Sequence, residues 1–273
     1  MNLLDRSIVL GPMGVSLGHL LLALAMLVAL MAGAWVGRKR QVHIGDSLFN
    51  ALLIGVIGAR IIFIARYWDS YDSLWSWFDI RDRGFEPLAG LAFALIYLGW
   101  RLWRHPDERR PLGAAMISGA LVWSLTAGAL VLMTPRGAPL PATPLTTLDS
   151  SEVMLPSIQN ETGQPMVVNL WASWCPPCRR EMPMLEQAQQ QLGDITFVFV
   201  NQGESPSALA TFLEQESLNL QHLYRDPNMT FGQQVGAVAM PTTLYYDADG
   251  NLVDTHFGEL SRATLDRSLE RLQ

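Results

Sequence analysis

Four long apolar segments in the first half of the chain limit its possible folds more than any other feature. They cover approximately residues 15–36, 48–66, 88–103 and 112–133. A helix that crosses a bilayer needs about 20 mainly apolar residues. One such segment is also compatible with a buried helix of a water-soluble protein, but four in succession favour a membrane domain. We therefore predict an all-α transmembrane bundle of four helices within residues 1–136.

The charges between these segments predict an orientation. The second connection is acidic and rich in tryptophan, whereas the first and the third are basic. The basic residues are Arg38, Lys39 and Arg40 in the first connection and Arg101, Arg104, Arg109 and Arg110 in the third. Basic connections remain on the cytoplasmic side of a membrane. Both termini are therefore predicted to lie on the outer side.

Arg60 interrupts the second apolar segment. An arginine within a membrane is costly, so it is a candidate for a functional site. Two structural interpretations remain open: the side chain extends to the outer interface, or it pairs with a neighbouring helix.

The second half of the chain differs in composition and charge. Residues 1–136 contain 13 Lys and Arg and 9 Asp and Glu, whereas residues 137–273 contain 6 and 16. The net charges are thus +4 and −10, and the acidic half has no basic stripe that would bind nucleic acid. Residues 137–153 are rich in proline and small polar residues, which predicts an extended linker.

Residues 154–273 predict one compact α/β domain. Buried strands are expected at Met166–Trp171 and Ile195–Val200, with a helix at Pro176–Gln191 between them. Further helices are expected at Ser205–Ser217, Thr230–Val235 and Ser261–Leu272, and a hairpin at Thr242–Phe257.

The only two cysteines of the chain, Cys175 and Cys178, lie where the first of these strands gives way to a helix. A helix N-terminus stabilises a thiolate, which makes Cys175 a candidate nucleophile. Cys178 is one turn away and could attack a mixed disulfide. Pro176 and Pro177 fit the first turn and stiffen it. A bridge between these cysteines closes a very small loop and adds little stability, so we predict a chemical role.

Half of a zinc site is the alternative interpretation of the cysteine pair. Zinc would need two further cysteine or histidine ligands at suitable spacing. The second half of the chain offers only His222 and His256, which are far apart in sequence and which we expect at the surface. We therefore predict no metal and no cofactor.

Two segments, WASWCPPCRREMP and VAMPTTLYYDADG, resemble those of thioredoxin-fold proteins. The resemblance covers about residues 150–273 and is strongest to the TlpA/ResA-like membrane-anchored thiol–disulfide oxidoreductases. It implies a thioredoxin fold after the transmembrane bundle. It also implies that Met240–Pro241 forms a cis-proline loop beside the cysteines. The alternative for Pro241 is an ordinary proline at the start of a strand.

The same resemblance implies a role for Glu181. It matches a buried glutamate that could take the proton of Cys178; the alternative is an exposed helix glutamate. Cytoplasmic thioredoxins carry a buried aspartate where this chain has Asn169, and an asparagine cannot carry a proton. Trp171 and Trp174 are either part of a docking surface or core aromatics. The candidates for a substrate groove are Trp171, Trp174, Pro176, Pro177 and Met240.

A second resemblance concerns the membrane half. RKRQVHIGDSLFNALLIGVIGARIIFIARYW is similar to the early part of prolipoprotein diacylglyceryl transferases, and Arg60 matches an arginine of that family. The chain departs from the family at RGFEPLAG, where a His-Gly-Gly segment would stand, and it is too short for the later spans. These departures argue against acyl transfer and favour a lipid-binding scaffold or a docking platform.

These features predict a thiol–disulfide oxidoreductase that is anchored in a bacterial inner membrane by several helices, with its N-terminus and its C-terminal domain in the periplasm. Family resemblance implies reduction of disulfides in exported proteins, for example during cytochrome c maturation. No cysteine precedes Cys175, so a separate transmembrane carrier of DsbD/CcdA type is the implied electron donor. The other partners are the exported substrate and the lipid bilayer.

Three alternatives remain open on the sequence alone. The first is an oxidase that donates disulfides, because potentials in this fold range from roughly −270 to −120 mV. The second is a lipid-modifying or lipid-binding membrane protein with a redox accessory domain. The third is a binding module without turnover.

Overall fold

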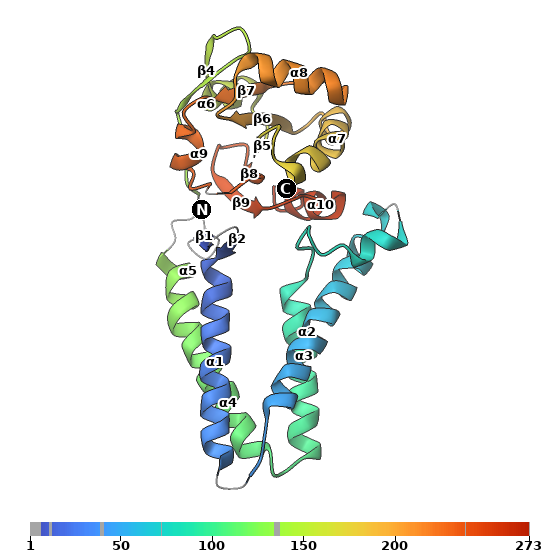
Figure 1. Cartoon of the computed structure of the whole chain (residues 1–273), viewed down its shortest axis with the longest axis vertical. Coiled ribbons are helices and arrows are strands. Elements are labelled where there is room, and N and C mark those ends of the chain that lie inside the picture. Colours follow the sequence, from blue (N-terminus) through green and yellow to red (C-terminus); the bar gives the residue numbers. More distant parts are fainter. Residues whose placement is uncertain are drawn as a thin grey trace. The chain divides into compact units, whose positions relative to one another are not determined.

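The computed structural model describes residues 7–10, 13–38, 41–71, 73–133, 137–237 and 239–272. Two compact units make up the chain (Figure 1). One comprises Val15–Met133, and the other comprises Met1–Gly14 and Thr134–Gln273. Lys39 and Arg40, which the sequence analysis placed in a basic connection, lie outside the described residues.

The first unit is helical, and its helices lie within a few residues of the predicted segments. They are α1 (Leu17–Gly37), α2 (Gly45–Arg66), α3 (Pro87–Arg104) and α4 (Arg109–Trp123), which continues through a π-helical turn (Ser124–Gly128) into α5 (Ala129–Met133). Two short paired strands, β1 (Ser7–Leu10) and β2 (Met13–Ser16), precede α1.

Three of the described helical segments are long and apolar enough to cross a membrane: Leu17–Gly37, Gly45–Arg66 and Arg109–Leu132. Helix α3 is not among them, because Arg101 and Arg104 in its last turn lower its mean hydropathy. The expected count of four membrane helices is thus reduced to three candidates.

Small residues let the helices of this unit approach in pairs, α1 with α4 and α2 with α3 (Figure 1). Gly55 of α2 faces Gly90 of α3, and a Cβ atom built on Gly90 would lie 2.9 Å from the carbonyl oxygen of Gly55. Such close backbone approach is typical of helices that pack in lipid.

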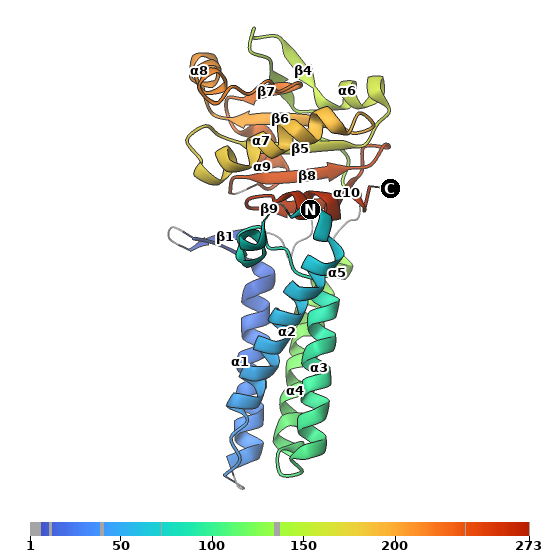
Figure 2. The same cartoon turned by 90° about the vertical axis from the view of Figure 1, so that its right-hand side faces the viewer.

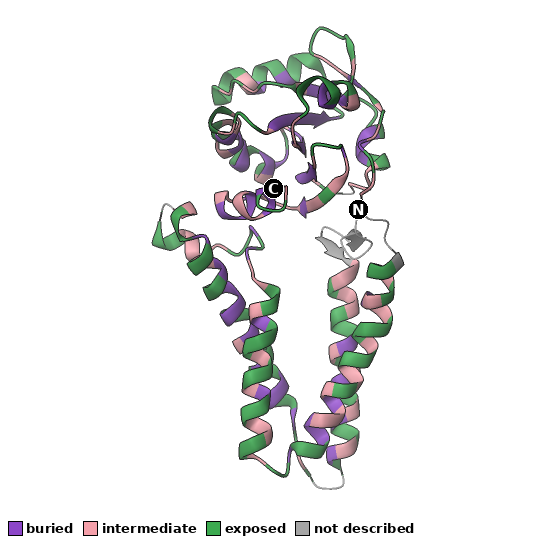
Figure 3. Ribbon diagram, turned by 180° about the vertical axis from the view of Figure 1, so that it is seen from behind, coloured by how far each residue is buried: buried purple, intermediate pink, exposed green. Residues whose placement is uncertain are grey.

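Large apolar side chains cover the outside of the helices. Figure 3 shows exposed residues along them, in contrast to the buried strands of the other unit. Examples are Leu27, Trp35, Phe49, Ile61, Ile96 and Ile117. Continuous apolar surface of this kind marks contact with a membrane or a partner rather than with water.

Arg60 is buried and holds the connection between α2 and α3. Its guanidinium donates hydrogen bonds to carbonyl oxygens of Ser76, Trp77, Asp79 and Gly84. It also forms an ion pair with Asp82, at 3.2 Å between Nη1 and Oδ1, and both side chains are largely buried. These partners lie in the connection between α2 and α3 and not on a neighbouring membrane helix, and they engage all three nitrogens of the guanidinium.

A second polar cluster joins the other ends of three helices. Glu108, just before α4, accepts hydrogen bonds from Ser47 of α2 at 2.8 Å and from Nε of Arg101 of α3 at 3.2 Å. Glu108 is buried, so both donors compensate for the water that its carboxylate has lost.

The second unit is built on a seven-stranded sheet in the order β4-β3-β7-β6-β5-β8-β9 (Figure 2). Its strands are β3 (Pro144–Thr146), β4 (Glu152–Met154), β5 (Met166–Trp171), β6 (Thr196–Gln202), β7 (Leu223–Asp226), β8 (Thr242–Tyr246) and β9 (Leu252–Phe257). Strands β5, β6 and β7 are parallel neighbours, whereas β8 runs antiparallel to β5. The carboxyl ends of β5, β6 and β7 therefore lie at the same edge of the sheet, next to the start of β8.

Helices cover both faces of this sheet. They are α6 (Leu155–Thr162), α7 (Pro176–Gln191), α8 (Pro206–Glu216), α9 (Thr230–Gln234) and α10 (Arg262–Leu269). Successive residues of a strand point to opposite faces. Accordingly, Val167 and Trp171 of β5 pack in one core with α7, α8 and α10, whereas Val168 and Leu170 pack in the other with α6 and α9.

The expected linker at residues 137–153 needs correction. This segment contains β3 and the first residues of β4, and β3 pairs with β7 through Thr146 and Arg225. Leu140 and Leu145 are buried in the core of the sheet. Proline and small polar residues pointed to an extended segment, and the structure uses that extension for strands at the edge of the sheet.

We expect replacement of Arg60 by alanine to release the connection between α2 and α3. The change removes the hydrogen bonds of the guanidinium and breaks its buried ion pair with Asp82, and the loss of one member of such a pair costs about 3–5 kcal/mol. The readouts are the thermal midpoint of the full chain in detergent and the rate of chymotrypsin cleavage within residues 67–86.

Arg81→Ala is the matched control, because Arg81 pairs with Asp79 in the same connection but is 61% exposed. Exposed pairs contribute about 0–1 kcal/mol, so this variant should resemble the wild type. Equal cleavage rates in the two variants would rule out the anchoring role of Arg60.

Candidate active site

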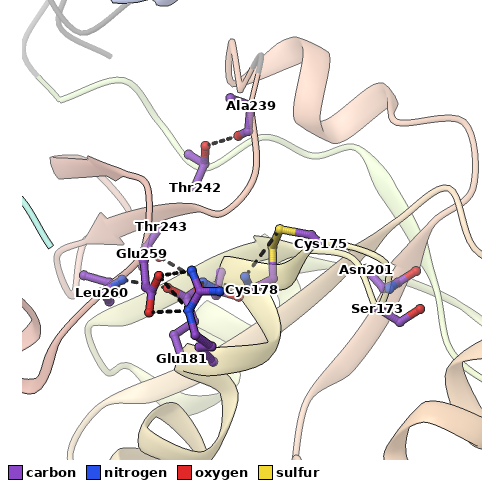
Figure 4. Close-up of a disulfide and its surroundings, with 12 residues drawn as sticks. Ser173, Cys175, Cys178, Glu181, Asn201, Ala239, Thr242, Thr243, Glu259 and Leu260 are labelled. Carbon is purple, nitrogen blue, oxygen red and sulfur yellow. Dashed lines mark hydrogen bonds and ion pairs between the residues drawn. A yellow bond between two sulfur atoms is a disulfide. The ribbon is translucent and has the colours of Figure 1, made fainter. Parts of the chain in front are cut away.

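The two cysteines lie where β5 ends and α7 begins (Figure 4). Cys175 is the N-cap of α7, and its Sγ accepts a hydrogen bond from the backbone N–H of Cys178 at 3.3 Å. The two residues form a disulfide with their Cα atoms 5.3 Å apart. Pro176 and Pro177 occupy the first turn, where a helix needs no N–H donor. Cys175 is 4% exposed and Cys178 is completely buried.

Glu181 lies one helical turn after Cys178 and is also buried. Its Oε1 accepts a hydrogen bond from the side-chain amide of Asn169 on β5, and its Oε2 accepts one from the backbone N–H of Leu260, both at 2.8 Å. The Asn169 amide also donates to Thr243 of β8 at 3.0 Å. Figure 4 shows Glu181 on α7, next to the segment that carries Glu259 and Leu260.

The environment of Glu181 changes its acidity. Loss of water on burial raises the pKa of Glu181 to about 8, and the nearby charge of Glu259 acts in the same direction. The hydrogen bonds from Leu260 and Asn169 favour the charged form and oppose this rise. The carboxyl group can therefore gain or lose a proton near neutral pH.

The Met240–Pro241 bond is cis, as the resemblance implied. Pro241 directly precedes β8, and its carbonyl oxygen accepts a hydrogen bond from the N–H of Gly258 at 2.9 Å. The hydroxyl of Thr242 donates to the carbonyl oxygen of Ala239 at 2.6 Å, which closes the turn. Met240 packs against the core cluster that contains both cysteines.

The two tryptophans near the cysteines have different environments. Trp171 is completely buried and packs on Phe212, with ring centroids 5.3 Å apart. It is therefore a core aromatic, and its proposed place in a substrate groove is wrong. Trp174 is 63% exposed beside Cys175 and remains available to a partner.

Sequence reasoning missed a carboxylate that holds the loop before Cys175. Oε2 of Glu204 accepts hydrogen bonds from the backbone N–H of Ser173 at 2.7 Å and from the amide of Asn201 at 2.6 Å. Its Oε1 accepts one from the Ser173 hydroxyl. Ser173 and Glu204 are 31 residues apart, but each follows one of two adjacent parallel strands. The contact between Ser173 and Glu204 could have been predicted only from the order of these strands.

A second missed contact lies on the other side of the pair. Arg180 of α7 forms an ion pair with Glu259, the residue before Leu260. This pair holds the segment whose N–H group reaches Glu181. Nothing in the spacing of these residues indicates the contact.

The two histidines of the second half of the chain have different neighbours. His256 is buried, contrary to expectation, and its Nε2 lies 3.3 Å from the carbonyl oxygen of Glu259. His222 lies near Tyr224 instead. Within the part of the chain that the structure describes, no three His, Cys, Asp or Glu residues gather in a way that could hold an ion.

Comparisons with known proteins agree with this geometry. The family model for redoxin matches residues 135–269. Thioredoxin 1 of Synechococcus elongatus is 30% identical over 112 residues, which cover 41% of this chain and 82% of that protein. The thiol:disulfide interchange protein HelX of Rhodobacter capsulatus is 30% identical over 110 residues, 40% of this chain and 61% of that protein. Thiol-disulfide oxidoreductase ResA of Halalkalibacterium halodurans is 24% identical over 113 residues, 41% of this chain and 64% of that protein.

The fold and the site define a thioredoxin-like α/β domain with a cysteine pair at a helix N-terminus. Through this domain the chain belongs to the thioredoxin family. It spans less than two thirds of the length of HelX and of ResA.

The first half of the chain matches a different family. The model for prolipoprotein diacylglyceryl transferase covers residues 7–128. This match and the three apolar helices identify a membrane protein. Both resemblances noted in the sequence are thus confirmed.

The raised pKa of Glu181 predicts a pH dependence of stability. An unfolded glutamate has a pKa of about 4.5, so between this value and about 8 the folded chain binds more protons than the unfolded chain. The contribution of Glu181 to stability is therefore complete below pH 4.5 and is lost as the pH rises to about 8. We expect the thermal midpoint of Glu181→Gln to exceed that of the wild type at pH 8.5 and to approach it at pH 5.

Glutamine fits this position because the buried Oδ1 of Asn169 has no partner among the described residues and can accept from the new amide after a flip. Glu186→Gln is the control, since Glu186 also accepts a backbone N–H, that of Asn219 at 2.6 Å, but away from the cysteines. A parallel pH profile for Glu181→Gln and the wild type would contradict the assignment.

Proposed function

We propose that this protein is a membrane-tethered thiol–disulfide oxidoreductase that reduces disulfides of exported proteins. The observation that carries the proposal is the Cys175–Cys178 pair at the start of α7, with the buried carboxyl group of Glu181 one turn further on. A helix N-terminus favours a thiolate, and a nearby buried acid with a pKa near 8 can exchange protons with a thiol.

Cys175 is the nucleophile in this proposal. It retains a small exposed area, whereas Cys178 has none. The Cys175 thiolate attacks one sulfur of the substrate disulfide, a mixed disulfide forms, and the other substrate sulfur leaves as a thiolate. Cys178 then attacks Sγ of Cys175, so that the internal disulfide forms and the second substrate thiolate leaves. Two electrons pass from the pair to the substrate.

Glu181 takes the proton of the Cys178 thiol in the second step. Water does not reach Cys178, so an internal base is needed for this transfer. A carboxyl group with a pKa of about 8 matches a cysteine thiol, whose ordinary pKa is about 8.5. Asn169 and Leu260 hold both carboxylate oxygens in place.

Pro241 and its neighbours shape the access of the substrate. Met240 and Met229 line a small hollow of about 130 Å³ next to the cis-proline turn. Methionine side chains adapt to apolar groups of different shape, which suits varied protein substrates. Trp174, Pro176 and Pro177 complete the surface around Cys175.

The membrane half serves as an anchor in this proposal. The basic connections support a topology with several spans in which the C-terminal domain lies on the periplasmic side of a bacterial inner membrane. The relation to prolipoprotein diacylglyceryl transferases favours a lipid-facing scaffold as a second role. Arg60 supports a structural use of that scaffold, because the α2–α3 connection occupies its guanidinium.

The pair needs a source of electrons outside the chain. No other cysteine is present, so the membrane helices cannot relay electrons by thiol exchange. A transmembrane carrier of DsbD/CcdA type is the proposed donor. HelX and ResA, the similar proteins named above, are a thiol:disulfide interchange protein and a thiol-disulfide oxidoreductase, which supports this reaction class.

Replacement of Cys178 by serine should trap the mixed disulfide. The first step still occurs at Cys175, but no second thiol can release the substrate. Non-reducing gels of cells should show covalent adducts for Cys178→Ser and none for Cys175→Ser. Adducts in the second variant alone would reverse the assigned roles.

The redox state of the pair in cells tests the direction of transfer. We expect Cys175 and Cys178 to be mostly reduced, and to become oxidised when the carrier is deleted, in an alkylation gel-shift experiment. A pair that is mostly oxidised in both strains would instead identify a disulfide donor.

A further inference from the structure

The carboxylate of Glu204 is fixed beside the loop that leads to Cys175. Its three hydrogen bonds come from Ser173, which is two residues before Cys175, and from Asn201 at the end of β6. In the view of Figure 4, Ser173 and Asn201 lie on one side of Cys175 and Glu181 on the other.

The backbone around Glu204 allows it little freedom. Gly203 has a φ of +77°, which favours glycine, and its N–H donates to the carbonyl oxygen of Asp226 at 3.0 Å. Ser205 is the N-cap of α8 and accepts the N–H of Ala208 at 3.2 Å. Glu204 is held between these two fixed residues, so its position is set before any substrate binds.

The charge of Glu204 is not balanced by a cation. Its partners are a backbone N–H, a hydroxyl and an amide, all of which are neutral. Of the charged residues on neighbouring elements, Arg179 pairs with Glu216 and Arg180 pairs with Glu259. On β7, Arg225 is buried and is the register partner of Asn201. Glu181 is buried, and its pKa of about 8 means that only a minority of molecules carries its charge at pH 7. Among the described residues, no arginine or histidine forms an ion pair with Glu204.

We propose that Glu204 is a positioning residue that keeps an uncompensated negative charge beside the Cys175 loop and so makes the pair more strongly reducing. A nearby negative charge disfavours a thiolate. The reduced form of the pair carries the Cys175 thiolate, and the disulfide carries no charge. Glu204 therefore destabilises the reduced form and shifts the equilibrium towards the disulfide, which lowers the reduction potential. This inference rests on the redox function proposed above. It assigns to Glu204 a part in setting the direction of electron transfer.

Glutamine at position 204 separates the charge from the geometry. Its carbonyl oxygen can accept from the Ser173 N–H and from Asn201, as Oε2 does now. Its amide can donate to the Ser173 hydroxyl, which accepts as readily as it donates. Glu204→Gln should therefore keep the loop in place, with a thermal midpoint close to that of the wild type.

The experiment equilibrates the full chain in detergent with glutathione buffers of known ratio and quantifies the dithiol by alkylation. We expect Glu204→Gln to shift the equilibrium towards the dithiol by about tenfold, which corresponds to about 30 mV for a two-electron couple. The pH dependence of iodoacetamide modification should also move, with the Cys175 thiol ionising at lower pH.

Two variants control for causes other than charge. Glu204→Asp keeps the charge but shortens the side chain, and it should remain within twofold of the wild-type equilibrium. Glu186→Gln removes a carboxylate of similar exposure that also accepts a backbone N–H, and it should have no effect. An equilibrium for Glu204→Gln within twofold of the wild type would overturn the inference, as would an equal shift in Glu204→Asp.

The outcome for the wild type distinguishes this inference from the proposed function. A wild-type pair that does not exchange with glutathione at all would contradict the redox function itself. A wild-type pair that exchanges normally, with Glu204→Gln unchanged, would contradict only the role of Glu204.

Discussion

The interior position of β5 in the sheet is the constraint on which the site depends. Because β5 pairs with β6 on one side and with β8 on the other, its carboxyl end lies between the Glu204 loop and the Met240–Pro241 turn. The chain can leave this strand only into α7, and Cys175 is the residue that caps that helix. Backbone pairing of these strands therefore fixes where Cys175, the Glu204 loop and the Met240–Pro241 turn lie.

Two carboxyl groups near the pair differ in burial and in hydrogen-bond partners. Glu181 is deep in the core, where loss of water raises its pKa, so it is suited to carry a proton. Glu204 is only partly buried and is held by three neutral donors, so it is suited to impose a charge. Similar residues thus obtain different roles from burial and from the donors that each one faces.

The membrane half shows the same principle at Arg60. A charged side chain among apolar helices is normally evidence of function. Here the connection between α2 and α3 supplies four carbonyl oxygens and one carboxylate to it. The hydrogen bonds and the ion pair offset the cost of burying the guanidinium and order the connection. This arrangement agrees with a scaffold and does not require a reaction centre.

The sequence by itself determined the long apolar helices, the α/β class and the cysteine pair at a helix start. The resemblance to thioredoxin-fold proteins implied the cis bond before Pro241. These features depend on local patterns: apolar length, strand and helix periodicity, and a short motif. The tertiary structure decided that residues 137–153 join the sheet, that Trp171 is core, and that Ser173, Leu260 and Glu259 surround the pair. Such contacts connect residues 31 to 79 positions apart, and only the order of the strands brings them within hydrogen-bonding distance.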